Sequence, residues 1–237
     1  MDVTVKKFAR DNALGGTEVL HALLRLQAIK SRGTAAHAAR CAQYARALAE
    51  QLRLPPDEIE AVSVAALLHD LGKIGIPDSI LLKPGPLTEK EWQSMRQHPV
   101  LSHWALARLG GFSDVLPLVR HHHERFDGAG YPDGLSGEDI PNGSRIILVI
   151  DAFDAMTSDR PYRRAMPVAD VAKELVRCSG SQFDPRMVRA FLLILCGLGH
   201  SRPLVLTRPD ARPDGLYANG DDGYSEDIWE PQLAQVV

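Results

Sequence analysis

Apolar residues recur at intervals of three and four along most of this chain, which is the spacing of one face of an α-helix. No stretch shows the strict alternation that is typical of a strand with one buried face. The pattern therefore predicts an all-α fold, a bundle of helices. The run Ile146–Ile150, taken alone, could also be a buried strand. We expect helices over residues 17–30, 34–52, 57–69, 88–98, 113–124, 144–157 and 185–196.

Residues that favour helix ends mark several of these boundaries. Asp57 can cap the third helix, because an aspartate side chain accepts hydrogen bonds from N–H groups of the first turn. Thr88–Glu91 has the pattern of a capping box, and Pro99 is expected to end the helix that this box opens. Asp184–Pro185 predicts a cap followed by proline at the first helical position.

Length and composition suggest one large domain with two flanking segments. A chain of 237 residues can bury one sizeable core. We expect an N-terminal segment over 1–16, the helical domain over 17–200 and a tail over 201–237. The tail is rich in Pro and Gly and holds three arginines against seven acidic residues. Inside the domain, Phe126–Gly143 contains five Gly and two Pro, and a loop of this length is usually functional.

Composition also excludes several classes of protein. The longest apolar runs are Ile146–Ile150 and Phe191–Cys196, far below the ~20 residues of a membrane helix. Residues 1–200 hold 24 basic and 23 acidic side chains without a basic face, so bulk binding to nucleic acid is not expected. Three dispersed cysteines and the lack of a secretory signal predict a cytoplasmic protein without a disulfide framework.

Histidine and aspartate residues lie at helix ends and on apolar helix faces. His69 and Asp70 end the apolar run Val62–Leu68, although such a pair alone is often a chance helix ending. His37 lies on an apolar face, where an unpaired imidazole would be costly. A lone histidine there is more often a satisfied core residue. His98, before a proline, would by itself usually be a surface or capping residue. No single one of these residues is diagnostic.

Two further groups favour a metal centre. His121–Glu124 could be a solvated patch, but a triple histidine beside a Gly-rich loop is unusual outside metal sites. Asp151 and Asp154 are three residues apart in an apolar segment, so one face of carboxylates points inward and needs a cation or hydrogen-bond donors. Together these groups supply up to seven ligands from five segments. That set is too large for one tetrahedral zinc and suits two octahedral first-row metals.

Arginines follow the second aspartate of this pair. Arg160 and Arg163 come one or two turns later, and the guanidinium fork matches the oxygens of a phosphate. A solvated basic turn is the alternative interpretation, and for Arg164 it is the one that we favour.

The order and spacing of these residues resemble the HD-GYP family of bacterial cyclic di-GMP phosphodiesterases, a branch of the HD hydrolase superfamily. The resemblance covers residues 20–195. It depends on LLHDLGKIGIPDSILLKPGPLTEKEW (67–92), HHERFDGAGYPDGLSGEDIP (122–141) and RIILVIDAFDAMTSDRPYR (145–163). Gly130-Tyr131-Pro132 is the triplet that names the family. The resemblance implies an HD-type helical bundle with the Gly/Pro-rich loop beside the metal centre.

The resemblance also implies roles for individual residues. Asp70 would bridge two divalent ions, such as iron or manganese, and Lys73 would lie near the scissile phosphate. Asp154 would lie directly outside the ligands, and His121 would not be one of them. The implied ligands are His37, His69, Asp70, His98, His122, His123 and Asp151. The implied substrate contacts are Arg160 and Arg163, and the loop that carries Tyr131 would border the pocket.

The chain departs from the family in three respects. Some members have a glutamate four residues before the first ligand histidine, where it helps to hold a third metal. Here this position is Gly33, so we expect a binuclear centre. After His98 the chain has Ser102 and His103 instead of glycine and a small residue, and His103 is expected at the surface. We recognise no receiver, sensory or membrane domain before the hydrolase, so we expect the regulatory input to be absent from this chain or supplied by a partner, either a regulatory protein or a second copy in a homodimer.

The implied reaction is hydrolysis of cyclic di-GMP to pGpG, and to GMP where the site also accepts the linear product. Two ions that share a water lower its pKa and make hydroxide available as the nucleophile. Lys73 or a metal-bound water could protonate the leaving oxygen. The alternatives are an HD phosphohydrolase for another cyclic dinucleotide and a non-catalytic cyclic di-GMP receptor. A receptor would have little reason to keep all seven ligands.

Overall fold

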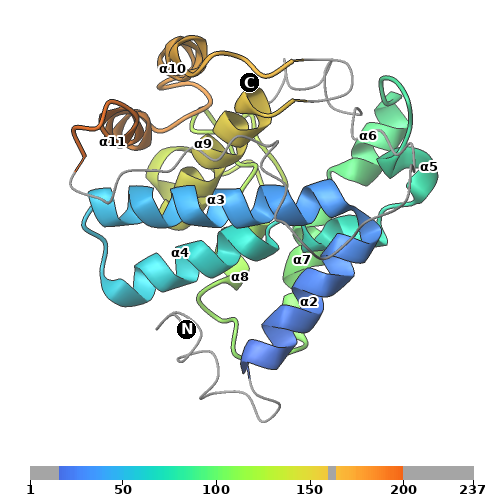
Figure 1. Ribbon diagram of the computed structural model, residues 1–237. Helices are drawn as coiled ribbons and strands as arrows, with labels where there is room; N and C mark the ends of the chain where they lie inside the picture. The colour runs from blue at the N-terminus through green and yellow to red at the C-terminus, as the bar shows by residue number, and fades with distance from the viewer. Residues whose placement is uncertain (1–15, 160–163, 200–237) are drawn as a thin grey trace, which may run out of the picture.

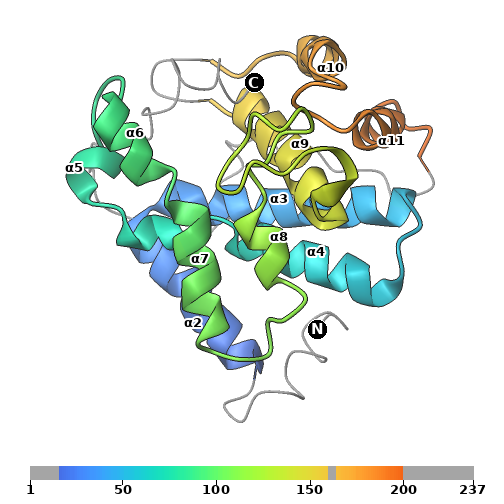
Figure 2. The ribbon, with the colours of Figure 1, turned by 180° about the vertical axis from the view of Figure 1, so that it is seen from behind.

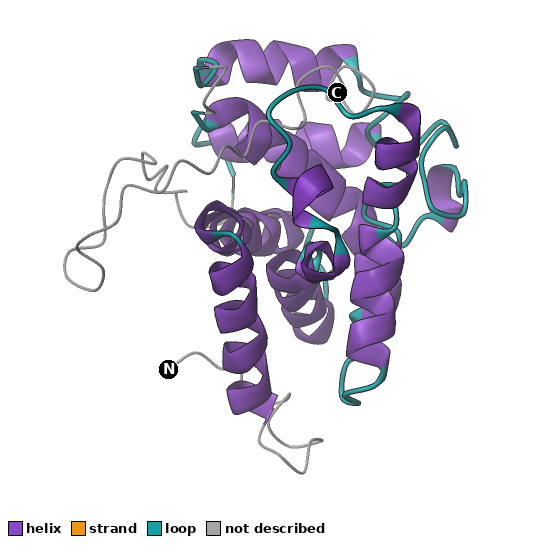
Figure 3. Cartoon of the chain, turned by 90° about the vertical axis from the view of Figure 1, so that its right-hand side faces the viewer, coloured by secondary structure: helices purple, strands orange, loops and turns teal. Residues whose placement is uncertain are grey.

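The computed structural model describes residues 16–159 and 164–199, and over these residues the chain is helical (Figure 3). The sole β-feature there is an isolated bridge between Ser179 and Phe183. The predicted all-α fold class is therefore confirmed. The α-helices are α2 (Gly16–Lys30), α3 (Arg32–Gln51), α4 (Pro56–Leu68), α5 (Asp78–Leu81), α6 (Glu89–Met95), α7 (His98–Ala107), α8 (Leu116–Arg120), α9 (Asn142–Thr157), α10 (Val168–Arg177) and α11 (Pro185–Leu195), with 3-10 helices η1 (Leu71–Gly75) and η2 (Gly137–Asp139).

Helices α3 and α4 lie side by side and form the centre of the bundle (Figure 1). Helix α9 packs against both of them, and α10 and α11 cover its outer side (Figure 2). Aromatic rings join three of these helices in the core. Tyr44 meets Phe153 edge to face at 5.5 Å between ring centroids, and Phe153 meets Phe191 in the same way at 4.9 Å. The core thus fixes α3, α9 and α11 relative to one another.

A second, smaller apolar cluster lies under α5 and α6. It consists of Ile76, Leu81, Leu87, Trp92 and Met95. The predicted capping box opens α6, since Thr88 Oγ1 accepts from the backbone N–H of Glu91 and the Glu91 carboxylate accepts from the N–H of Thr88. The cluster thus lies in the segment that connects α4 to α7, which consists of η1, α5 and α6.

Several predicted helix boundaries are wrong. Helix α4 begins at Pro56, so Asp57 lies in its first turn and not at the cap. Pro99 lies in the first turn of α7, because proline fits there as well as it ends a preceding helix. The helix predicted over 113–124 is reduced to α8, and α5, α7 and α10 were not predicted. Helix α10 was missed although Val168, Val171 and Leu175 recur at the spacing of one helical face.

The remaining sequence predictions about organisation have mixed outcomes. Ile146–Ile150 lies inside α9, so the alternative of a buried strand is wrong. The flanking segments proposed for 1–16 and 201–237 lie almost entirely outside the described residues. Among the helices that the structure describes, none has both the length and the apolar character needed to cross a bilayer.

A buried ion pair anchors α11 to α9. Arg145 Nη1 donates to Asp184 Oδ2 at 2.6 Å, and both side chains are almost fully buried. The other oxygen, Asp184 Oδ1, accepts from the backbone N–H of Arg186 at 2.7 Å and caps α11, as predicted. One carboxylate therefore neutralises a buried charge and begins a helix.

We expect Asp184→Ala to lower the free energy of unfolding by about 3–5 kcal/mol, because it leaves the buried Arg145 guanidinium without its counter-charge. Urea denaturation measures this change. Asp170→Ala is the matched control, since Asp170 pairs with Lys173 on the exposed face of α10. It should cost no more than about 1 kcal/mol. Equal, small effects in both variants would contradict the role assigned to Asp184.

Candidate metal centre

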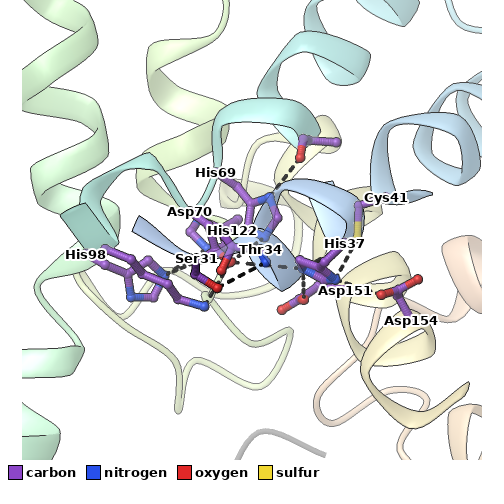
Figure 4. Close-up of polar contacts among 12 residues, drawn as sticks. Ser31, Thr34, His37, Cys41, His69, Asp70, His98, His122, Asp151 and Asp154 are labelled. Carbon is purple, nitrogen blue, oxygen red and sulfur yellow. Dashed lines mark hydrogen bonds and ion pairs between the residues drawn. The ribbon is translucent and has the colours of Figure 1, made fainter. Parts of the chain in front are cut away.

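The structure brings all seven predicted ligands together in one place. Figure 4 labels each of them except His123. They come from five separate segments of the chain. His37 lies on α3, His69 and Asp70 follow α4, and His98 begins α7. His122 and His123 follow α8, and Asp151 lies on α9. The described ligand atoms form two groups within which all atoms lie within 4.8 Å of one another: His98, His122 and His123, and His37, His69 and Asp70.

Three of the histidines are oriented by the same backbone contact. In each of them Nδ1 lies within hydrogen-bond distance of the carbonyl oxygen three residues earlier. Because a carbonyl only accepts, Nδ1 carries the proton and Nε2 keeps its lone pair. The pairs are His69 with Ala66 (2.8 Å), His98 with Met95 (3.0 Å) and His122 with Val119 (2.7 Å). Local helix geometry thus sets the tautomer that a metal ligand requires.

In the part of the chain that the structure describes, no donor satisfies the Nε2 atoms that result. His98 Nε2 and His122 Nε2 face each other at 3.2 Å, and both residues are fully buried. Within the described residues, the buried Nε2 of His69 has no hydrogen-bond partner. Converging lone pairs in a buried site are unfavourable without a cation. This arrangement fits divalent metal ions, for which neutral imidazole is a common ligand.

Burial keeps these imidazoles neutral. Desolvation, with the nearby His123, holds the pKa of His98 well below its usual range, and desolvation acts in the same way on His122. Desolvation lowers the pKa of His123 to about 4. Metal binding requires the unprotonated ring. The three-histidine group is therefore in its ligand form at neutral pH before any ion enters.

Asp70 lies between the two groups of ligands. Its Oδ1 is 3.4 Å from His98 Nε2, and its Oδ2 is 3.4 Å from His69 Nε2 and 4.0 Å from His37 Nε2. Lys73 Nζ donates to Oδ2 at 2.8 Å. Burial alone would raise the pKa of Asp70, but the His69 ring and the Lys73 ammonium group beside it hold the pKa well below its usual range. Asp70 is thus a carboxylate with one oxygen toward each group.

The backbone around Asp70 is held by a close approach to α7. A side chain at Gly72 would put a Cβ 2.0 Å from the carbonyl oxygen of His98, so no residue other than glycine fits. Ser102 joins the same two elements, because its Oγ donates to the His69 carbonyl and accepts from the Gly72 N–H, both at 2.8 Å. Half-buried His103 lies farther along α7, beside the Leu116 carbonyl, and outside the centre.

His37 is oriented by a carboxylate and an arginine. Its Nδ1 lies 2.7 Å from Asp154 Oδ2, and its Nε2 lies 3.2 Å from Asp151 Oδ1. Arg40 donates two hydrogen bonds to the Asp154 carboxylate, from Nε to Oδ1 at 2.6 Å and from Nη2 to Oδ2 at 2.8 Å. Burial raises the pKa of Asp154, but the hydrogen bonds from His37 and Arg40 outweigh this and lower it. Such a carboxylate behind a ligand histidine fixes the ring and raises its basicity.

The Tyr131 loop packs directly on the centre. The Tyr131 ring stacks on His123 at 4.9 Å between centroids, and the backbone N–H of Tyr131 donates to the carbonyl oxygen of His123. Buried Glu124 accepts from the N–H groups of Asp133, Gly134 and Leu135 and holds the loop in place. A Cβ at Gly130 would lie 2.2 Å from the backbone nitrogen of Arg125. The glycine of the triplet is therefore required by contact with the chain that carries the histidines.

The other predicted residues have different outcomes. Arg160 and Arg163 lie outside the described residues, and Arg164 is exposed. His121 Nδ1 lies 3.6 Å from Glu124 Oε1 and 3.5 Å from Asp133 Oδ2, and His121 belongs to neither of the two groups of predicted ligands. Sequence reasoning missed Arg40 and Glu124. Arg40 lies three residues after His37 on the same helical face, and a basic residue at that spacing is the signal that could have identified it.

We expect Arg40→Met to weaken metal binding about 10- to 100-fold, because Asp154 then loses the donors that hold it against His37. Metal titration of the folded variant measures the affinity. Arg46→Met on the same helix is the control, since Arg46 pairs with Glu50 at 3.8 Å and is not part of the contact with Asp154. An unchanged metal affinity in Arg40→Met would show that Asp154 does not need this partner.

Comparison with known proteins agrees with this geometry. The chain matches the HD domain family over residues 21–187. It is 45% identical over 177 residues to the cyclic di-GMP phosphodiesterase response regulator RpfG of Xanthomonas campestris, which covers 74% of this chain and 47% of the relative. It is 42% identical over 139 residues to the 3'3'-cGAMP-specific phosphodiesterase 3 of Vibrio cholerae, covering 59% and 30%.

A solved structure supports the fold. The HD domain of the L. monocytogenes phosphodiesterase PgpH superposes with a TM-score of 0.56 at 16% identity, covering 75% of this chain and 99% of that one. The chain spans about half the length of the first of the curated relatives. With His69-Asp70 in a cluster of metal-type ligands and Gly130-Tyr131-Pro132 packed on it, the chain belongs to the HD domain family and to its HD-GYP branch.

Proposed function

We propose that this chain is a metal-dependent phosphodiesterase that hydrolyses cyclic di-GMP to pGpG at a binuclear centre. The observation that carries the proposal is the position of Asp70, whose two oxygens face two separate groups of ligands. A carboxylate so placed can bridge two ions. The proposed substrate is taken from two relatives that are named cyclic di-GMP phosphodiesterases and are 45% and 40% identical to this chain.

Each ion would have its own histidines. His37, His69 and Asp151 would hold one, and His98, His122 and His123 the other, with Asp70 shared. Imidazole with carboxylate oxygen suits divalent iron, manganese or a similar first-row metal. When bound, such ions supply a hydrolytic nucleophile from water near neutral pH and neutralise phosphate charge.

The chain's own residues would orient the substrate around this centre. Lys73 lies beside Asp70, where its ammonium group can contact a phosphate oxygen or give a proton to the leaving oxygen. Tyr131 would border the pocket, since its ring covers His123. We propose that Arg160 and Arg163 bind the substrate phosphates, on the basis of the motif alone. Loss of Arg160 should then impair substrate handling while the metals remain.

A second substrate is favoured by one specific observation. The relative of V. cholerae that is 42% identical to this chain is named for 3'3'-cGAMP, which differs from cyclic di-GMP in one base. Assaying both nucleotides side by side decides between them. Binding of either without turnover would instead indicate a receptor.

We also propose a division of the chain into a catalytic domain over 17–200 and an acidic tail over 201–237. Regulation would come from a protein partner or a homodimer.

We expect the metal-loaded protein to convert cyclic di-GMP to pGpG, and His69→Ala and Asp70→Ala to lose activity and metal together. Both side chains are buried ligands, so their loss removes a donor that nothing nearby replaces. Mass-resolved chromatography of the products and elemental analysis of each variant are the measurements. Full metal stoichiometry in both folded variants would refute the ligand assignment.

Two ions per chain are expected, and not three. Gly33 stands in the first turn of α3 and has no side chain to offer a third ion. Anomalous scattering from crystals of the metal-loaded protein counts the ions. Three fully occupied sites in one pocket would overturn this expectation and would show that another residue supplies the missing ligand.

A further inference from the structure

An open pocket lies next to Asp70, between the end of α2, the start of α3 and η1. Its empty volume is about 190 Å³, including the part open to solvent. Gln27, Lys30, Ser31 and Thr34 line it on one side, and Asp70 and Lys73 on the other. Figure 4 shows Ser31 and Thr34 in the same region as Asp70. None of the four residues from α2 and α3 has a role in the centre described above.

Gln27 is the unusual residue of this pocket. Its side chain is 2% exposed, and within the described part of the chain neither its amide nitrogen nor its amide oxygen has a hydrogen-bond partner. Burying an unpaired carboxamide costs free energy on the order of 1–3 kcal/mol. The neighbouring lysines are paired, Lys30 with Asp78 and Lys73 with Asp70. A buried polar group that stays unpaired in a pocket is poised for a ligand.

The pocket favours an anion. Two lysines line it, Lys30 and Lys73, each paired with an aspartate, and of these two aspartates only Asp70 belongs to the lining and it faces the metal ligands. The 20-residue helix α3 begins here, with Ser31 as its N-cap and no acidic residue in its first turn. The N-terminus of a long helix attracts phosphate through its N–H groups and its dipole. Gln27 Nε2 adds a donor, and Gln27 Oε1 can accept from a neighbouring ribose hydroxyl.

We propose that this pocket binds a phosphate group of the nucleotide other than the one at the metal centre, with Gln27 donating to it. The nucleotide's identity rests on the proposed function, but the phosphate chemistry rests on the pocket. A cyclic dinucleotide and linear pGpG each have a second phosphate, whereas GpG has only one. The pocket therefore distinguishes ligands by their number of phosphates.

The test compares pGpG with GpG in metal-loaded Gln27→Met. Methionine keeps the volume and removes the amide. Isothermal titration calorimetry, with chromatography to count intact nucleotide, should show affinity for pGpG about 10-fold lower than in wild type. Affinity for GpG and metal content should not change. The melting temperature should rise by about 2–4 °C, because an unsatisfied buried amide has been removed. Gln43→Met, on the exposed face of α3, should change none of these quantities.

A glutamine with a purely structural role would not give a variant that is more stable and yet binds pGpG more weakly. A lower melting temperature in Gln27→Met with unchanged pGpG affinity would overturn the proposal, and so would equal losses for pGpG and GpG. Metal loss would also overturn it, since Gln27 would then act through the centre. If wild type fails to hydrolyse cyclic di-GMP but Gln27→Met still loses its preference for pGpG, the phosphodiesterase proposal falls and the phosphate pocket stands.

Discussion

The centre depends on a hydrogen bond between histidine Nδ1 and the carbonyl oxygen three residues earlier, which occurs at His69, His98 and His122. Because the two residues are only three apart in the sequence, the helix end that carries each histidine also sets the tautomer of its ring. The Nε2 lone pairs are directed inward before any ion binds. Preorganisation of this kind removes the cost of orienting each ring when the metal enters.

The rest of the fold brings these helix ends to one point. Glycines permit the two closest approaches, Gly72 against His98 and Gly130 against Arg125. Two carboxylates then hold the neighbouring elements in place. Glu124 binds the backbone of the Tyr131 loop, and Asp154 orients the His37 ring. A buried cluster of lone pairs and carboxylates is costly without cations. The apolar core that joins α3, α9 and α11 stabilises the fold against this cost.

Sequence reasoning selected the seven candidate ligands through the motifs of the family resemblance, and some of them also stand out locally. His69-Asp70 ends an apolar run, and Asp151 interrupts another, so both are visible from periodicity alone. Arg40 and Glu124 were missed for a physical reason. Their partners, Asp154 and the backbone of 133–135, are distant in sequence or lie on a loop, and an isolated arginine or glutamate looks like ordinary surface. Helix ends near proline were also misplaced, because proline can either stop a helix or start one.

By itself the sequence determined the all-helical class, the candidate ligands and the HD-GYP motifs, since periodicity and motif spacing are properties of neighbouring residues. Only the tertiary structure decided that Asp70 stands between two groups of ligands and that Arg40 supports Asp154. It alone showed that Gln27 lies buried beside the centre without a hydrogen-bond partner among the described residues. These are contacts between segments far apart in the chain, and their distances follow from helix packing, which no local pattern encodes.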